Sequence, residues 1–283
     1  MHMNAPVISF INMKGGVGKT TLCISIGEYL ANYKDKKVLI IDIDPQFNAT
    51  QSFMGKHDKI SEYLSLVKQR KTIKRIFEVN ASIYDEDAVL KKEDVIYSVY
   101  PNLDIIPGDI NIMFEHNTVD TIRLIRIRNF IEDNKLREIY DYIFIDCPPT
   151  ISMYTEASIM ASTHYIMPMR IDQYSVLGSN NLLSIVSKLA RDQRLTIKPL
   201  GVIYTDTAPK RLTKKTRAIK TAIETEKGIR DLYFFKNHFS KVRDLQVGQQ
   251  LNFASAYSQS KEIIDRICTE LEAKLKEVDD ESE

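Results

Sequence analysis

The sequence lacks the features of membrane-spanning and disulfide-stabilised proteins. No run within its 283 residues approaches the ~18 consecutive apolar residues of a membrane-spanning helix, and its N-terminus has no signal-peptide pattern. Its three cysteines, Cys23, Cys147 and Cys268, are far apart and odd in number, which indicates neither a disulfide framework nor a zinc site. We therefore expect a cytoplasmic protein whose cysteines pack as small apolar side chains.

The chain also has almost no net charge. It contains 39 basic and 38 acidic residues, a formal charge of +1, so a polyanionic partner would have to bind a local basic patch. Because 43% of the residues are hydrophobic, the chain can bury a full core, and we expect one large α/β domain over residues 1–283. Residues 279–283 are nearly all acidic and are predicted to form a flexible tail.

Short β-branched runs alternate with helical patterns along the chain. The predicted strands cover residues 7–12, 37–42, 102–106, 142–146, 164–169, 199–204 and 232–235. The predicted helices cover residues 19–33, 118–138, 173–194, 210–227 and 258–278. This alternation predicts a doubly wound, mostly parallel sheet whose strands are buried on both faces. Residues 55–100 are less regular, and we expect them to form helices and loops that cover one edge of the sheet.

A glycine-rich segment connects the first predicted strand to the first predicted helix. It is similar to the pattern G-x-x-x-x-G-K-[ST], in which backbone N–H groups and a lysine bind phosphate. Its candidate phosphate-binding residues are Lys14, Gly15, Gly16, Val17, Gly18, Lys19, Thr20 and Thr21. Lys14 replaces the first glycine of the pattern. Because Lys19 already supplies a charge in cis, we interpret Lys14 as reaching a phosphate on a second subunit, as an arginine finger does in trans.

Carboxylates end two further predicted strands. Asp42 and Asp44 are at alternate positions, so they share a face at the edge where α/β sheets bind ligands. One of them can contact magnesium-bound water while the other orients an attacking water. Asp146 follows a buried run, in the manner of a Walker B carboxylate that supports Mg²⁺. The motifs together predict phosphoryl transfer. The candidate catalytic residues are Lys14, Lys19 and one of the pair Asp42 and Asp44, and the candidate magnesium site is formed by Thr20, Asp146 and the other carboxylate of that pair.

Four segments match one known family pattern: the phosphate loop, residues 42–50 (DIDPQFNAT), residues 106–109 (IPGD) and residues 140–149 (YDYIFIDCPP). Together they span most of residues 6–205, and they resemble the ParA-type DNA-partition ATPases of the deviant Walker A, or MinD/ParA, group. The resemblance implies a P-loop ATPase that uses ATP and Mg²⁺, hydrolyses ATP slowly and forms an ATP-sandwich homodimer. It also implies that Lys14 contacts phosphate across the dimer interface and Lys19 contacts it in cis. Thr20 would ligate Mg²⁺, Asp44 would position the hydrolytic water and Asp146 would support the metal.

A basic segment near the C-terminal third is the candidate DNA-binding region. Residues 208–220 contain no acid and six basic residues: Lys210, Arg211, Lys214, Lys215, Arg217 and Lys220. On a helix that begins after Pro209, part of this charge would face solvent while Leu212, Ile219 and Ile223 dock on the domain. Such patches bind DNA without sequence preference, through its phosphates. The resemblance implies the same partner, together with nucleoid association and a ParB-like centromere-binding protein that stimulates hydrolysis.

Two other classes on this fold are alternatives. A MinD-like membrane-positioning ATPase would end in a basic amphipathic helix. Residues 258–278 have apolar residues at helical spacing but are rich in Glu, which favours docking onto the domain and no membrane partner. The second alternative is a metabolic or redox enzyme on this fold. Its nitrogenase-reductase type shares a metal cluster between subunits, and Cys147 without a second suitably placed cysteine argues against such a cluster. Only thirteen residues precede Lys14, so we expect a short form without an N-terminal helix-turn-helix region.

Overall fold

One sheet organises the part of the chain that the structure describes. This computed structural model describes residues 4–56, 58–78, 90–114, 121–207, 212–240 and 253–281. Within them, eight strands lie in the order β3-β4-β2-β5-β1-β6-β7-β8, and all neighbours are parallel except β3 and β4. The strands are β1 (Val7–Phe10), β2 (Val38–Asp42), β3 (Tyr97–Tyr100), β4 (Leu103–Ile106), β5 (Tyr142–Asp146), β6 (His164–Arg170), β7 (Lys198–Thr207) and β8 (Phe239–Ser240). The predicted doubly wound, mostly parallel α/β fold is confirmed.

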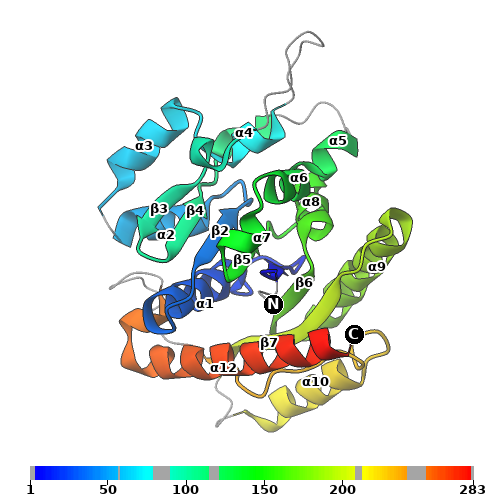
Figure 1. The fold of residues 1–283 in the computed structure, drawn as a ribbon. Coiled ribbons are helices and arrows are strands. Elements are labelled where there is room, and N and C mark those ends of the chain that lie inside the picture. The colour runs from blue at the N-terminus through cyan, green and yellow to red at the C-terminus, as the bar shows by residue number, and fades with distance from the viewer. Residues whose placement is uncertain are drawn as a thin grey trace.

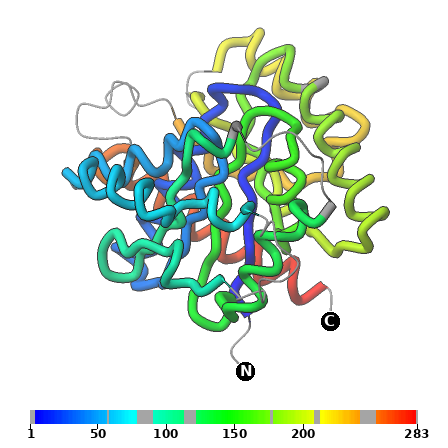
Figure 2. The backbone as a smooth tube through the Cα atoms, turned by 90° about the horizontal axis from the view of Figure 1, so that it is seen from above, coloured from blue at the N-terminus to red at the C-terminus, as the bar shows by residue number. Residues whose placement is uncertain are grey.

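Helices cover both faces of this sheet (Figure 1). The α-helices are α1 (Lys19–Tyr33), α2 (Asn48–Lys56), α3 (Ile60–Lys68), α4 (Ile73–Phe77), α5 (Thr121–Leu124), α6 (Arg126–Asp133), α7 (Leu136–Ile139), α8 (Met153–Ala161), α9 (Ser175–Gln193), α10 (Lys214–Thr225) and α12 (Ser258–Asp280). Short 3-10 turns occur at η1 (Lys92–Asp94), η2 (Ile110–Phe114) and η4 (Ala254–Ala256). Figure 2 shows α2 and α3 on one side of the molecule and α9 on the opposite side, as expected from the two ends of the strand order.

The central strands are buried on both faces and divide their side chains between two cores. On β1, Ile8 and Phe10 join the core that contains α1 and α12, whereas Val7 joins the core that contains α6, α8 and α9. The same alternation occurs on β5, where Phe144 packs edge-on against Phe10 with ring centroids 5.6 Å apart. Alternation with burial on both sides is what a parallel sheet covered by two helical layers requires.

Two predicted segments differ in the structure. Residues 118–138 do not form one helix: within the described part, α6 ends at Asp133, and Lys135 then adopts a left-handed φ of 50° that stops the helix before α7. The irregular region 55–100 also contains a strand that we did not predict, β3, which pairs antiparallel with β4. Its turn, at Pro101 and Asn102, includes a left-handed Asn102.

The C-terminal part brings two further corrections. Residues 232–235 contribute an isolated bridge, between Phe234 and Val202, instead of a strand. Helix α12 continues through Asp280, and Asp279 accepts a hydrogen bond from Lys198, so the predicted flexible tail does not begin at residue 279. The apolar side of α12 is buried beside α1, as the sequence predicts. None of the described helices has the length and apolarity to cross a membrane.

Candidate active site

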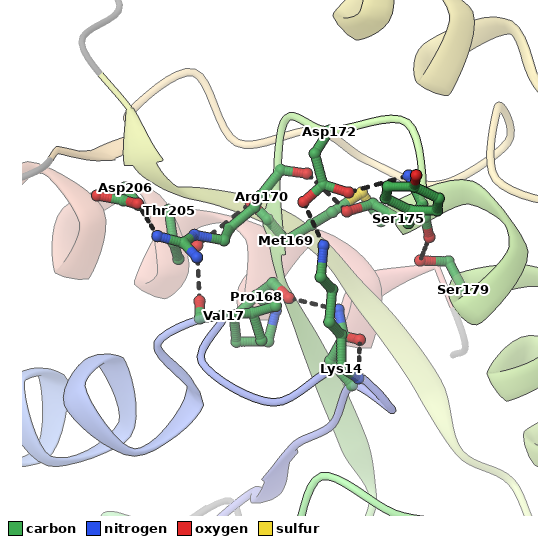
Figure 3. Close-up of polar contacts among 12 residues, drawn as sticks. Lys14, Val17, Pro168, Met169, Arg170, Asp172, Ser175, Ser179, Thr205 and Asp206 are labelled. Atoms are coloured by element: carbon green, nitrogen blue, oxygen red, sulfur yellow. Dashed lines mark hydrogen bonds and ion pairs between the residues drawn. The ribbon is translucent and has the colours of Figure 1, made fainter.

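The glycine-rich loop lies between β1 and α1 and is held by hydrogen bonds to two neighbouring strands, β6 and β7. Gly16 and Gly18 have φ values of 69° and 85°, which side chains other than glycine rarely adopt. The Val17 carbonyl accepts a 2.6 Å hydrogen bond from the Thr205 hydroxyl at the end of β7 (Figure 3). Asn12 donates to the Pro168 carbonyl at 2.7 Å and accepts from the Lys14 N–H at 2.9 Å. These hydrogen bonds anchor the loop to the sheet through Val17 and Asn12.

Lys19 is the charged group at the base of the loop. Its side chain is only 6% exposed, and its Nζ donates to the Lys14 carbonyl at 3.2 Å. Burial lowers the pKa of Lys19, although Asp146 and Asp44 act in the opposite direction. A desolvated ammonium at the N-terminus of α1 is a favourable site for an anionic phosphate.

Two carboxylates lie side by side on adjacent strands. Asp42 of β2 and Asp146 of β5 are register partners, and both are fully buried. Burial raises the pKa of Asp42 to about 7, although hydrogen bonds from Thr50 oppose this shift. Burial also raises the pKa of Asp146 well above its ordinary value, and the nearby charge of Asp42 adds to this shift. Two neighbouring buried carboxyls cannot both ionise easily without a cation.

These carboxylates have oxygen atoms free for a metal or its water ligands. Among the described residues, neither oxygen of Asp146 has a hydrogen bond of normal geometry, although the Thr20 hydroxyl is close enough to lower the pKa of Asp146. Asp42 Oδ1 also has no hydrogen-bond partner there. Orphaned buried oxygens beside a threonine hydroxyl fit an octahedral Mg²⁺. The described residues contain no group of three or more metal-binding side chains, so Mg²⁺ would take its other ligands from phosphate and water.

Asp44 lies two residues after β2, on the chain that leaves the sheet. It is 5% exposed, and its Oδ1 accepts a 2.9 Å hydrogen bond from the Gln46 N–H. Burial raises the pKa of Asp44, while that hydrogen bond and the charge of Lys19 oppose the shift. The charge of Lys19 therefore acts on Asp44 as it does on Asp146, and the role of Asp44 in positioning water stays a prediction.

Lys14 has a partner within its own chain. Its Nζ lies 2.5 Å from Asp172 Oδ2, in the turn after β6, and the two side chains are 36% and 31% exposed (Figure 3). Partial burial acts to raise the pKa of Asp172, but the hydrogen bond and charge of Lys14 outweigh it and lower that pKa. Lys14 also lies 6.0 Å from the ring centroid of Tyr174. Sequence reasoning expected Lys14 to face a second subunit and did not foresee this contact.

Comparison with known proteins now assigns the family. A family model described as an AAA domain matches residues 5–198, more than half of the chain. The sporulation initiation inhibitor protein Soj of Bacillus subtilis is 32% identical over 201 residues, which cover 70% of this chain and 72% of Soj. The chromosome partitioning protein ParA of Caulobacter vibrioides is 28% identical over 201 residues, which cover 70% of this chain and 68% of that protein.

The fold agrees with these sequence relationships. The crystal structure of a plasmid partition protein from Borrelia burgdorferi, bound to AMPPNP, superposes with a TM-score of 0.69 at 23% identity. The superposition covers 94% of this chain and 98% of that one. The chain is a ParA-type partition ATPase. The resemblance seen in the sequence motifs is thereby confirmed, although the roles of individual site residues stay predictions.

The predicted DNA-binding residues of this ParA-type ATPase lie partly on α10. Lys210 and Arg211 fall outside the described residues. Lys214, Lys215 and Arg217 are exposed. Thr213 caps the N-terminus of α10, because its hydroxyl accepts a 3.1 Å hydrogen bond from the Thr216 N–H. Ile223 is fully buried, as expected for the docking side of the helix.

Lys220 differs from the other basic residues of α10. Its Nζ lies 2.5 Å from Glu224 Oε1 and 5.2 Å from the ring centroid of Tyr204, so its charge is already compensated within the ParA-type fold. The sequence window that ended at residue 220 did not include Glu224, one turn further on. Lys220 is therefore a weaker candidate for a DNA contact than the three exposed basic residues that precede it.

Three contacts of the loop were missed at the sequence level. Asn12 carried a detectable signal, because a polar residue at the end of a buried predicted strand and before a phosphate loop is well placed to fix that loop. Asp172 and Thr205 carried none, since they contact Lys14 and Val17 only because β6 and β7 lie beside β1 in the sheet.

Proposed function

We propose that this chain is an ATP- and Mg²⁺-dependent DNA-segregation ATPase. In this proposal, an ATP-bound homodimer binds nonspecific DNA on the nucleoid and leaves it after hydrolysis, which a ParB-like centromere-binding protein stimulates. The observation that carries the proposal is the position of two lysines in one loop, Lys19 buried at its base and Lys14 at its outer rim.

The inner part of the site supports ATP binding and hydrolysis. The loop N–H groups and Lys19 would hold the β and γ phosphates. The Thr20 hydroxyl would ligate Mg²⁺, and Asp146 and Asp42 would support it through water; the metal would neutralise charge on the phosphate groups. Asp44, near Lys19, would orient the attacking water. Phosphoryl transfer needs mainly positioning and charge neutralisation, so this small set of groups suffices.

The outer part of the site supports dimer formation. Exposed apolar residues follow three strands at the edge that carries the loop: Ile110 after β4, Ile151 after β5 and Tyr174 after β6, which are 51%, 38% and 76% exposed. Apolar side chains exposed around a charged site favour a protein partner. In an ATP-sandwich dimer, Lys14 would leave Asp172 and bind the phosphate of the opposite subunit, so ATP would join the two subunits.

DNA binding is assigned to α10. Its exposed residues Lys214, Lys215 and Arg217 carry three positive charges with no ion pair between described residues. Phosphate contacts of this kind give affinity without sequence preference. A dimer presents two copies of α10, which raises the apparent affinity for one duplex and makes DNA binding depend on ATP.

A salt-titrated binding assay on arbitrary duplex DNA tests this proposal. The protein is measured with ATP, with ADP and without nucleotide, each in the presence of Mg²⁺. We expect retention on DNA with ATP, weak retention in the other two conditions, and an affinity that falls steeply as salt increases. Equal retention in all three conditions, or none with ATP, would reject the segregation function. Binding to anionic vesicles in place of DNA would favour the membrane-positioning alternative.

A further inference from the structure

The segment Ile106–Asp109, at the end of β4, is a sequence motif that the proposed chemistry does not use. In the structure, its Gly108 N–H donates a 2.8 Å hydrogen bond to the Thr50 hydroxyl. The same hydroxyl donates to Asp42 Oδ2 at 2.7 Å, and the Thr50 N–H donates to that oxygen at 2.8 Å. Thr50 and Asp42 are both fully buried. The segment therefore reaches the candidate magnesium site through a single threonine.

The backbone N–H of Gly108 fixes the direction of the hydrogen bonds that lead to Asp42. A backbone N–H can only donate, so the Thr50 hydroxyl must accept from Gly108 and has its one proton left for Asp42. Both donors of Thr50 meet on Asp42 Oδ2, while Asp42 Oδ1 has no hydrogen-bond partner among the described residues. One oxygen of Asp42 is thus held by the protein and the other is available.

Position 108 requires glycine because its backbone lies too close to Phe47 and Asp42 to leave room for a side chain. A Cβ atom there would lie 2.6 Å from Phe47 Cβ and 3.0 Å from Asp42 Cγ, distances at which the neighbours must move. Any side chain at this position would push the turn away from Thr50 or displace the carboxylate itself. Only glycine therefore allows the turn to pack directly against Asp42.

The turn is also held from the outside. Tyr63 of α3 donates to the Gly108 carbonyl at 3.1 Å, and its ring stacks on Phe47 with centroids 5.4 Å apart. Thr72 donates to Asp109 Oδ2 at 2.8 Å, and the Pro107 carbonyl accepts from the Ile73 N–H at 2.8 Å. The α3 and α4 segments thereby fix the turn that fixes Thr50.

We propose that Thr50 is a positioning residue for Asp42, that Gly108 and Tyr63 hold Thr50 in place, and that this chain keeps Asp42 Oδ1 directed to the water shell of Mg²⁺. This inference rests on the proposed function for the identity of the metal and nucleotide. Groups that orient a ligand of a metal, or of its water shell, commonly change metal affinity or activity about 10- to 100-fold when removed.

The test compares Thr50→Val, which keeps the shape and loses the hydroxyl, with Thr50→Ser, which keeps the hydroxyl. Binding of a fluorescent ADP is measured with and without Mg²⁺, and ATP turnover is measured against Mg²⁺ concentration. For Thr50→Val we expect unchanged ADP binding without Mg²⁺, because the phosphate loop is untouched. We expect the Mg²⁺ concentration for half-maximal binding and turnover to rise about tenfold or more. Thr50→Ser should lie within about threefold of the unaltered protein.

Equal Mg²⁺ dependence in Thr50→Val and the unaltered protein would overturn the inference, and so would an equal loss in Thr50→Ser. If Thr50→Val does not fold, Tyr63→Phe replaces it: this change removes only the hydroxyl that holds Gly108 and should raise the Mg²⁺ requirement by a smaller factor, about two- to fivefold. An unchanged requirement in Tyr63→Phe would then reject the chain of contacts. An unaltered protein that does not bind ADP at all would instead reject the proposed function.

Discussion

The inner and outer parts of the same loop have opposite physical character. The inner part, Lys19 with Asp42 and Asp146, is almost closed to water, and burial shifts the pKa of each group toward its neutral form. The outer part, Lys14 with Asp172 and Tyr174, is reached by solvent, and its central contact is a half-exposed ion pair. The difference indicates two tasks: the inner groups are arranged for one ligand, whereas the outer lysine can exchange one partner for another at low cost.

The largest effect is expected from the inner lysine. Lys19→Ala removes the buried ammonium that would bind the phosphates in the proposed function, and we expect ATP turnover to fall by about 100- to 1,000-fold or more, as for other electrostatic groups in closed sites. Nucleotide affinity should fall as well, because this charge acts before and during hydrolysis. Steady-state phosphate release and fluorescent-nucleotide binding measure both. A Lys19→Ala protein with normal turnover would show that the inner part is not the catalytic centre.

Asp44→Ala should separate binding from hydrolysis. We expect ATP binding to persist and turnover to fall about 100-fold, the usual contribution of a group that positions or deprotonates water. The ATP-bound dimer should accumulate and stay on DNA. Size-exclusion chromatography with light scattering after incubation with ATP measures the dimer, and Asp44→Asn is the matched variant that keeps the side-chain shape. Turnover at the normal rate in either variant would contradict the assignment of Asp44.

A third prediction extends the comparison to the exposed surface of α10. Reversing Lys214, Lys215 and Arg217 to Glu should weaken binding to every duplex sequence and reduce the salt slope by up to about three, since each phosphate contact contributes roughly 0.9. Basal turnover should be unchanged. The matched control reverses three exposed lysines elsewhere, Lys68, Lys91 and Lys135, and so makes the same change in net charge. An equal loss of DNA binding in both triple variants would indicate a nonspecific effect of charge.

The same contrast explains how much could be predicted from the sequence. Asp42 and Asp146 were found because each ends a buried strand, and parallel strands bring their carboxyl ends to one edge, where β2 and β5 place the two carboxylates side by side. Lys19 was found from the glycine-rich pattern that contains it. The contact between Lys14 and Asp172 was not predictable, because it joins residues 158 positions apart through the placement of β6 beside β1. Strand β3 was missed because it has only four residues and is only partly buried, so its sequence shows no clear apolar pattern.

The smallest effect is expected from a substitution of Asp172, the partner of Lys14. This substitution tests directly whether Lys14 exchanges Asp172 for a phosphate of the second subunit. Asp172→Asn removes the negative charge that holds Lys14 in its own chain, whereas Lys14→Ala removes the lysine itself. If Lys14 must leave Asp172 to bind phosphate in trans, then Asp172→Asn should favour the ATP-dependent dimer by about two- to fivefold, the range expected from a half-exposed ion pair. Lys14→Ala should bind nucleotide normally and fail to dimerise.

Sedimentation in the presence of ATP, across a range of protein concentrations, measures the dimerisation constant and resolves an effect of this size. All variants are made in the Asp44→Ala protein, so that hydrolysis does not deplete the dimer. The double variant with both Asp172→Asn and Lys14→Ala is the control, since it should behave like Lys14→Ala alone. Weaker dimerisation in Asp172→Asn would mean that the carboxylate helps to build the interface. In that case the half-exposed ion pair belongs to the assembled dimer, and the outer lysine keeps a single partner, as the inner groups do.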